Sequence, residues 1–398
     1  MAWPEKSGKN SWRVRYEKDD GSLASVSGFT SEAAAQEVAD RLNREAAVRG
    51  FVPTASTQPF GGWIEPWFGS IDVAESTLAQ YRSLTRNHIE PRWGVVPFNA
   101  ISNLDAHTWA VRLRNGGLSD STVKTIMKIL KMMLADAADE GIIPTSPIHA
   151  RRRGRRRHQL KPDIVHATPL QVLRIALQAA SLMGEWAAIL IISAAYTGAR
   201  WGELTGLQRH NIHLDDGCFV IDPRIGALHE VDGKLSLGQP KTASSARTVT
   251  LPPFLCDIWG YLLDQHDHPH IFVTRDLELH RRSNFSRRVM RPACDGNYGV
   301  ANPRVRTRTI CPDLVFHGLR HSHNTWLIGD DIPEVGRARR LGHQIHDKIR
   351  EIYDHVAPEV EAKILIVLQR RWEDSLATQF PNGLNFPDAA PMPALAAA

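Results

Sequence analysis

The side chains that could carry out chemistry are mainly basic, and they occur in short motifs that lie far apart in the chain. Residues 317–321 read HGLRH, in which His317 and Arg320 are one helical turn apart and would share one side of a helix. Gly342 and His343 follow, and a glycine there would let the backbone approach a neighbouring segment closely. Because a guanidinium group can bind two phosphate oxygens at once, this stretch indicates a site for phosphate.

A second motif, YTGARWGEL, covers residues 196–204. Gly198 would end an apolar helix, and a new helix would begin at Arg200. The free backbone N–H groups at a helix start, together with this guanidinium, favour an anion. Glu203, one turn later, could orient Arg200, and we expect it to be structural because an acid would repel phosphate. The alternative is a simple helix-turn-helix with a surface arginine.

Lys241 and Tyr353 complete a set that suits phosphodiester chemistry. Lys241 lies at the edge of a polar loop that we interpret as a hairpin, and it could protonate a leaving oxygen, although an ordinary exposed lysine would look the same. Tyr353 follows His343 by ten residues and could attack phosphorus to form a phosphotyrosine ester. Two guanidinium groups would stabilise the doubly negative transition state without a metal. The set therefore predicts metal-free strand transfer on DNA.

The distribution of charge indicates where DNA could be held. The 398-residue chain has a net charge of +5, and residues 151–158 hold six arginines and no acid. Like charges at this density repel one another, so we interpret the segment as a tether between domains. It could follow a phosphate backbone, which we favour, or be a solvated linker or a localisation-like patch. Arginines outnumber lysines 37 to 11, which suits phosphate binding but also fits GC-rich codons.

Composition argues against several other classes of protein. The four cysteines include no CxxC pair, which argues against a disulfide framework or a zinc finger and suits a reducing cytoplasm. No apolar run approaches the ~20 residues of a membrane span, and the N-terminus lacks the apolar core of a signal peptide. His317, His321 and His323 have no matching cysteine or carboxylate cluster, so we expect no metal site.

Periodicity predicts the elements that must position these motifs. We expect two short strands within 11–29, a helix over 30–49, and a compact helical domain with helices over 75–89, 105–114 and 121–140. Farther along, we expect helices over 169–182, 185–196, 253–264, 284–292, 317–328 and 359–371, and strands over 218–222, 247–251 and 271–274.

The ordered motifs TGARWGEL, PKTASSARTVTLP, HGLRH, LGH and IYDHV resemble those of the tyrosine recombinases, specifically the phage-type and integrative-element integrases. Residues 284–293 are similar to the same group, and the resemblance covers essentially the whole chain. It implies a multidomain fold class: a small β-sheet plus helix N-terminal module, an all-α core-binding domain, and a mixed α+β, mostly helical catalytic domain. The implied ranges are an arm-type DNA-binding module at 1–50, a linker at 51–62, the core-binding domain at 63–150, a basic linker at 151–160, the catalytic domain at 161–375 and a disordered tail at 376–398.

The resemblance also implies a role for each residue of the set. Arg200 and Arg320 would clamp the scissile phosphate, Lys241 would protonate the leaving 5′ oxygen, His317 would assist proton transfer with Tyr353, His343 would hydrogen-bond the phosphate, and Tyr353 would form a 3′-phosphotyrosyl link. For DNA binding we single out Arg151, Arg152, Arg153, Arg155, Arg156 and Arg157, together with Arg13 and Arg15, which would share one strand face. Arg247 could contact DNA or pin the hairpin.

The implied activity is that of a site-specific integrase that acts without metal, ATP or other cofactor. Its partners would be double-stranded DNA attachment sites, further copies of the chain in a tetramer around a four-way junction, a host DNA-bending protein and a directionality factor. The implied location is cytoplasmic, at the nucleoid and away from membranes. Two positions depart from the family pattern: Gly318 replaces a usual acid, and Arg350 replaces a frequent threonine. The alternatives are a relaxing topoisomerase and a non-catalytic DNA-binding protein.

Overall fold

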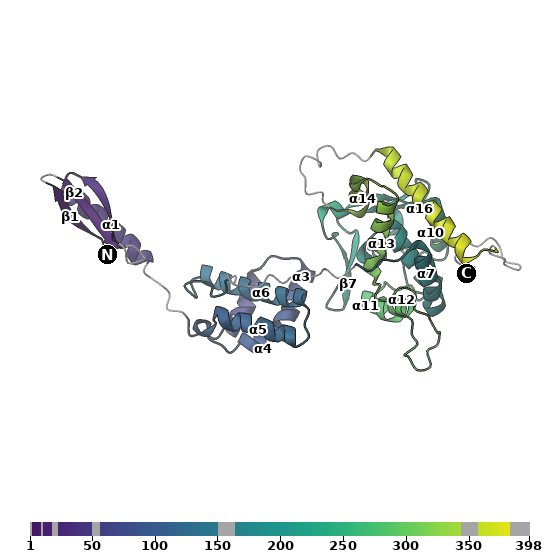
Figure 1. Ribbon diagram of the computed structural model, residues 1–398, viewed down its shortest axis with the longest axis horizontal. Helices are drawn as coiled ribbons and strands as arrows, with labels where there is room; N and C mark the ends of the chain where they lie inside the picture. Colours follow the sequence, from purple (N-terminus) through teal and green to yellow (C-terminus); the bar gives the residue numbers. More distant parts are fainter. Residues whose placement is uncertain are drawn as a thin grey trace. The chain divides into compact units, whose positions relative to one another are not determined.

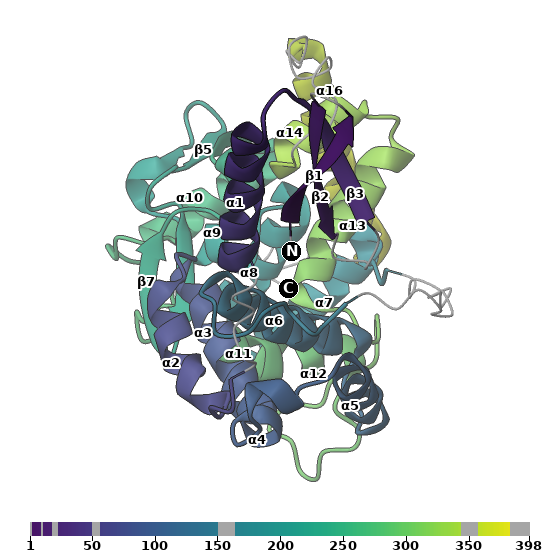
Figure 2. The same ribbon diagram turned by 90° about the vertical axis from the view of Figure 1, so that its left-hand side faces the viewer.

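The computed structural model describes residues 2–8, 11–17, 23–49, 56–149, 164–343 and 357–382 (Figures 1 and 2). Tyr353, Arg350 and the arginine run 151–157 lie outside these residues. The chain divides into two compact units, residues 1–156 and 157–398. The first unit contains two separate hydrophobic cores, so three parts are described in turn.

The N-terminal part is a three-stranded antiparallel sheet covered by one helix. Its elements are β1 (Ala2–Gly8), β2 (Ser11–Glu17), β3 (Leu23–Phe29) and α1 (Glu32–Arg49), with strand order β1-β2-β3. The fully buried Val14 packs with Ala35 and Ala39 of α1. Side chains alternate along a strand, so Arg13 and Arg15 lie on the opposite face of the sheet from Val14. The prediction missed β1, whose Pro4 and Gly8 are poor strand signals.

The second part is all helical. Its elements are α2 (Gly61–Ser70), α3 (Glu75–Leu84), a π-helical turn η1 (Thr85–Ile89), α4 (Glu90–Trp93), the short turn η2 (Phe98–Ala100), α5 (Asn103–Asn115) and α6 (Asp120–Asp139). Ser119 caps α6 by accepting the backbone N–H of Thr122 at 3.2 Å. The linker predicted over 51–62 ends earlier than expected, because Phe60 is fully buried in this core and packs edge-to-face on Phe98 at 5.5 Å.

The third part is built around one helix that is buried on all sides. Its helices are α7 (Pro169–Met183), α8 (Glu185–Thr197), α9 (Trp201–Thr205), α10 (Pro253–Asp264), α11 (Arg282–Phe285), α12 (Arg291–Asp295), α13 (Phe316–Gly329), α14 (Glu334–Leu341) and α16 (Pro358–Gln379). Every residue of α8 from Ala187 to Thr197 is buried, and α7, α10 and α13 pack against it. Helix α16, yellow in Figure 1, lies beside α7 and α10. It extends four residues past the predicted domain end at 375.

The strands of this part form two small sheets. They are β4 (Ile212–His213), β5 (Cys218–Ile221) and β8 (Arg247–Thr250) in one sheet, and β6 (Ala227–Val231) with β7 (Lys234–Gly238) in the other. The hairpin is therefore β6–β7, closed by Asp232 and Gly233, both with positive φ. The segment predicted as a hairpin around Lys241 instead connects the two sheets, so that prediction was wrong.

Two other predicted elements differ from the structure. The strand expected over 271–274 is absent from the described residues there, which make only isolated bridges such as Val273 with Leu279. The helix expected over 284–292 begins at Arg282 and is interrupted by a π-helical turn, η5 (Ser286–Met290), before α12. Among the helices that the structure describes, none is long and apolar enough to cross a membrane.

Gly198 ends α8 in the left-handed region, with φ of +67°. A Cβ atom there would lie 2.6 Å from Leu341 Cδ2 and 2.8 Å from His323 Cδ2. Gly217 has a similar φ of +59°, but its nearest neighbour to such a Cβ is 3.8 Å away. The two glycines therefore share backbone strain and differ in steric contact.

We predict that Gly198→Ala lowers the free energy of unfolding by about 3 kcal/mol, the sum of left-handed strain and overpacking. Gly217→Ala, the matched control, should lower it by only about 1 kcal/mol, from strain alone. Urea unfolding of both variants measures the difference. Equal losses would show that the contact of Gly198 with α13 and α14 is not tight.

Candidate active site

Two arginines from distant elements meet at the end of α8. Arg320 lies on α13 with 4 % of its surface exposed, and its Nη1 donates to the carbonyl oxygen of Gly198 at 2.7 Å. Arg200 is the N-cap residue of α9, and its Nη1 donates to Ser245 Oγ at 2.8 Å. The structure therefore brings together the two guanidinium groups that the sequence assigned to the phosphate clamp.

The carbonyl end of α14 organises the cluster. Three consecutive carbonyl oxygens there each accept a hydrogen bond from a different guanidinium group. The Arg340 carbonyl oxygen accepts from Arg247 Nε at 2.6 Å, and the Leu341 carbonyl oxygen accepts from Arg320 Nη2 at 2.5 Å. The Gly342 carbonyl oxygen accepts from Arg200 Nη2 at 3.5 Å. The last carbonyls of a helix have no partner within it and carry its negative dipole end, so they suit cations.

Gly342 allows this helix end to pack tightly against the segment before β8. Its φ is +65°, and a Cβ atom there would lie 2.8 Å from the carbonyl oxygen of Ser244. The close approach predicted for this glycine is confirmed. It lets the Ser244 hydroxyl donate to the Gly342 carbonyl oxygen at 3.3 Å.

Glu203 supplies a buried carboxylate between two arginines. It is 2 % exposed, and its Oε1 lies 2.6 Å from Arg200 Nη1 while its Oε2 lies 3.2 Å from Arg247 Nη2. Burial opposes its ionisation, but Arg247 and Arg200 hold the pKa of Glu203 below its ordinary value. Glu203 therefore orients Arg200, as the spacing predicted. Arg247 is 6 % exposed and also donates to the Ser245 carbonyl oxygen, so it pins this segment.

His317 and His343 lie at the accessible side of the arginines. Partial burial, the neighbouring His321 and the charge of Arg320 lower the pKa of His317 to about 4. Partial burial and the charges of Arg320 and Arg200 likewise lower the pKa of His343 to about 4. Both side chains are exposed and neutral at pH 7, so each can accept or share a proton with a ligand.

The other residues singled out from the sequence are less closely connected. Lys241 is exposed one residue before Thr242, whose hydroxyl lies 2.8 Å from Ser245 Oγ. Tyr353 and the arginines of 151–157 lie outside the described residues. In the N-terminal part, Arg13 Nε lies 2.5 Å and Arg15 Nε 3.6 Å from Glu5 Oε2. This counter-charge was not predicted from the sequence, because the strand β1 that carries Glu5 was not predicted.

Two further residues of the site, Ser245 and Arg340, were not identified from the sequence. Ser245 is fully buried and accepts from Arg200. The motif SSAR around it carries no recognisable chemical pattern, so nothing in the sequence distinguished it from Ser244. Arg340 directly precedes the LGH motif, but an arginine near a helix end is usually exposed. Only the three-dimensional packing identifies either residue.

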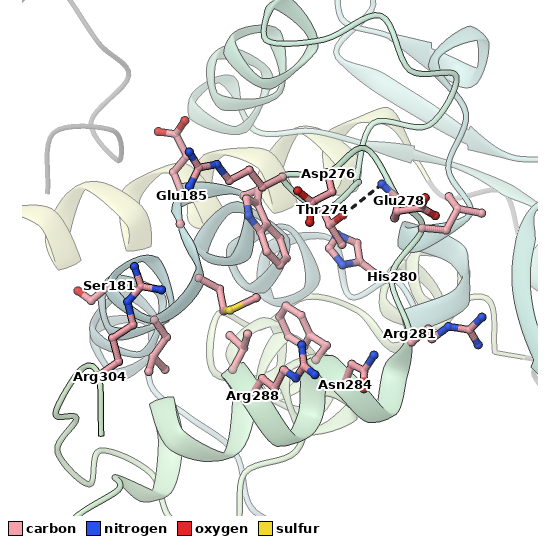
Figure 3. Close-up of a pocket in the computed structure, with 18 of the residues that line it drawn as sticks. Ser181, Glu185, Thr274, Asp276, Glu278, His280, Arg281, Asn284, Arg288 and Arg304 are labelled. Atoms are coloured by element: carbon pink, nitrogen blue, oxygen red, sulfur yellow. Dashed lines mark hydrogen bonds between the residues drawn. The ribbon is translucent and has the colours of Figure 1, made fainter. Parts of the chain in front are cut away.

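A separate pocket of about 920 Å³ lies between the α7–α8 junction and α11 (Figure 3). Its lining includes Trp186, His280, Phe285 and Arg288, and none of the candidate catalytic residues among those described. His280 stacks on Trp186 with ring centroids 4.7 Å apart and is 3 % exposed. Burial lowers the pKa of His280 to about 4, and its Nε2 atom has no hydrogen-bond partner among the described residues.

The comparisons with known proteins agree with the motif order. Residues 168–359 match the model of the phage integrase family. The chain is 24% identical over 320 residues to the putative prophage phiRv2 integrase of Mycobacterium tuberculosis (strain CDC 1551 / Oshkosh), which covers 79% of each chain. It is 24% identical over 284 residues to the integrase of Mycobacterium phage L5, covering 70% of each.

Solved structures share the fold. A Tn1549 transposon integrase in complex with a circular intermediate DNA matches with a TM-score of 0.60 and 15% identity over 76% of this chain and 97% of that one. A lambda integrase tetramer bound to a Holliday junction matches with a TM-score of 0.53 and 16% identity over 86% and 98%. Residues 168–359 therefore form a domain of the phage integrase family. The multidomain, mostly helical fold class predicted from the sequence is confirmed by the fold shared with these structures.

We predict that Glu203→Gln lowers the free energy of unfolding by about 3 kcal/mol, because it leaves the buried Arg247 and the partly buried Arg200 without their carboxylate. Glu230→Gln is the matched control, since Glu230 forms an ion pair with Arg281 at 3.2 Å where both side chains are 30–40 % exposed. That variant should lose less than about 1 kcal/mol. If urea unfolding gives equal losses, Glu203 is not the counter-charge that holds the cluster.

We also predict that His280 makes stability fall in mild acid. Its pKa is about 4 in the folded chain and about 6.5 when unfolded, so the unfolded state binds the extra proton between these values. The contribution is present above pH 6.5, and about 2 kcal/mol of it is lost by pH 5. His280→Phe should lose correspondingly less between pH 7 and pH 5 in urea unfolding, whereas a variant of the exposed His213 should behave as the parent. An unchanged slope in His280→Phe would contradict the assignment.

Proposed function

We propose that this protein is a site-specific DNA integrase that cuts and rejoins strands through a 3′-phosphotyrosyl intermediate. The observation that carries the proposal is the meeting of Arg200 and Arg320 beside two neutral, accessible histidines. A phosphodiester has one negative charge and its displacement transition state has two, so guanidinium groups fixed in advance stabilise the transition state more than the ground state.

Each residue then has a defined task. Arg200 and Arg320 bind the non-bridging oxygens of the scissile phosphate, and His343 donates a hydrogen bond to it. The hydroxyl of Tyr353 attacks phosphorus, and His317 takes up its proton. Lys241, exposed on the segment joined to Ser245 through Thr242, gives a proton to the leaving 5′ oxygen. The bond to tyrosine conserves the energy of the broken ester, so religation needs no ATP.

The two N-terminal parts would hold the DNA. Arg13 and Arg15 lie on the sheet face that α1 leaves uncovered, where they could bind phosphates of an arm-type site, with Glu5 limiting their net charge. The helical part would bind the core site, and the arginines of 151–157 would follow the backbone between domains. We further propose that the protein acts as a tetramer around a four-way junction, together with a host DNA-bending protein and a directionality factor. Its proposed location is the nucleoid.

The decisive experiment is covalent trapping on suicide DNA. A pool of nicked duplexes with randomised cores is first enriched for bound molecules, and the protein is then incubated with it and denatured. We predict a denaturant-resistant adduct whose peptide map places the DNA on Tyr353, and no adduct with Tyr353→Phe at equal binding. Peptide mapping to another residue would overturn the assignment of the nucleophile.

The same reaction separates the alternatives. Rejoining of strands between two different duplexes supports the integrase, whereas relaxation of supercoiled plasmid without joined products supports a topoisomerase. Binding without any adduct from the parent protein would make the chain a non-catalytic DNA-binding protein.

A further inference from the structure

One buried guanidinium belongs to no part of the proposed phosphate clamp. Arg340, on the last turn of α14, is 2 % exposed. Each of its three guanidinium nitrogens donates a hydrogen bond to a different group. Nε donates to His323 Nε2 at 3.0 Å, Nη1 donates to Thr250 Oγ1 at 3.0 Å, and Nη2 donates to the Tyr196 carbonyl oxygen at 3.1 Å. These partners lie on α13, β8 and α8. Among the residues that the structure describes, no carboxylate forms an ion pair with it, so a charge has been buried at considerable cost.

The partner on α13 is held in one tautomer. His323 is fully buried, and its Nδ1 lies 2.8 Å from the carbonyl oxygen of Ala195. A carbonyl only accepts, so Nδ1 carries the hydrogen and Nε2 offers its lone pair to Arg340. His323 is also one turn along α13 from Arg320. The contact therefore ties α14 to the helix that carries a clamp arginine.

The partner on β8 leads to the C-terminal helix. Thr250 Oγ1 lies 3.1 Å from Glu361 Oε2 on α16, so the hydroxyl donates to the carboxylate and accepts from Arg340. Glu361 also acts on Arg340 through space as a negative charge. The described residues thus link α16, β8, α14, α13 and α8 through one guanidinium.

The backbone at the same position faces the clamp. The carbonyl oxygen of Arg340 accepts Arg247, and the carbonyls of the next two residues accept Arg320 and Arg200. The contacts that hold the Arg340 side chain therefore also hold the three carbonyl oxygens to which the other guanidinium groups donate. A displacement of about 1 Å at such a point can cost about 100-fold in rate.

We propose that Arg340 is a positioning residue for DNA cleavage, which holds the turn Leu341–Gly342–His343 in register with Arg320 and Arg200. This inference rests on the proposed function, since the register matters only if the cluster acts on a phosphate. Arg340 does not touch the DNA itself. Through Thr250 and Glu361, the position of this turn also depends on how α16 packs.

The first test is Arg340→Met, which keeps most of the side chain's length and removes its charge and donors. The substitution removes the desolvation cost of a buried charge but leaves the groups that accepted from Arg340 without a donor, so these two effects on stability oppose each other and the urea midpoint serves to define the folded fraction. In single-turnover trapping on suicide DNA, the rate at saturating DNA should fall about 100-fold. The half-saturating DNA concentration should stay within about twofold, because ground-state binding is not affected.

A merely structural role gives a different pattern, in which the saturated cleavage rate of the folded fraction equals that of the parent whatever the change in stability. That result would overturn the proposal.

Arg340→Lys tests geometry against charge. Lysine keeps the charge but has one nitrogen for three directions, so it should recover only a small part of the lost rate. Full recovery would contradict the requirement for three directed donors.

Thr250→Val provides a second variant that preserves shape and removes only the hydroxyl. We expect a smaller fall, about tenfold, in the saturated cleavage rate. Thr248→Val is the matched control, since Thr248 is exposed two residues earlier on the same strand and should cleave as the parent does. If Arg340→Met does not fold, this pair decides: equal rates for the two valine variants contradict the proposal.

A readout without DNA keeps this inference distinct from the proposed function. In nitrogen-15 spectra of the histidine rings, the parent should show His323 as the Nδ1–H tautomer. Arg340→Met should shift the ring signals of His343, because the turn that carries it is released. Unmoved His343 signals would overturn the positioning role even if the parent cleaves DNA. A parent that gives no adduct, with His343 signals that do move, would instead refute the proposed function alone.

Discussion

The site can form only because neighbouring carbonyl oxygens and one carboxylate offset the mutual repulsion of its guanidinium groups. Arg200, Arg247 and Arg320 come from separate elements and converge on one region, where burial and neighbouring charge lower the pKa of Arg320 to about 9. Two features offset the repulsion. The carbonyl oxygens at the end of α14 accept hydrogen bonds from all three groups. Glu203 forms an ion pair with Arg200 through one carboxylate oxygen and with Arg247 through the other. The compensation is incomplete, which leaves the site ready for an anion.

The fold supplies this arrangement through close helix contacts. Helix α8 is buried throughout, ends at Gly198 in a left-handed conformation and thereby exposes a carbonyl oxygen to Arg320. Helix α14 ends in the same way at Gly342. At both positions a Cβ atom would meet neighbouring atoms at less than 3 Å. The two helix ends and the arginines between them therefore depend on residues that have no side chain.

Sequence reasoning located much of the site because its motifs are local. His317 and Arg320 share a helix, Arg200 and Glu203 share a turn, and each spacing alone defines a geometry. Contacts between distant segments were not predictable in this way. The role of Arg247 was left open, and Ser245 and Arg340 were not identified, since each acquires its partners only through packing. The strand expected over 271–274 and the hairpin expected around Lys241 were wrong because apolar runs and polar loops do not specify which strands pair.

The most direct test of the central claim removes the charge from the phosphate instead of from the protein. A suicide duplex with a neutral methylphosphonate at the scissile position has a transition state with one negative charge fewer, so it needs less positive charge around it. The measurement is the cleavage rate of Arg200→Ala relative to the parent on each substrate. The electrostatic account predicts that the loss caused by the substitution is at least about tenfold smaller on the methylphosphonate. An equal loss on both substrates would contradict it.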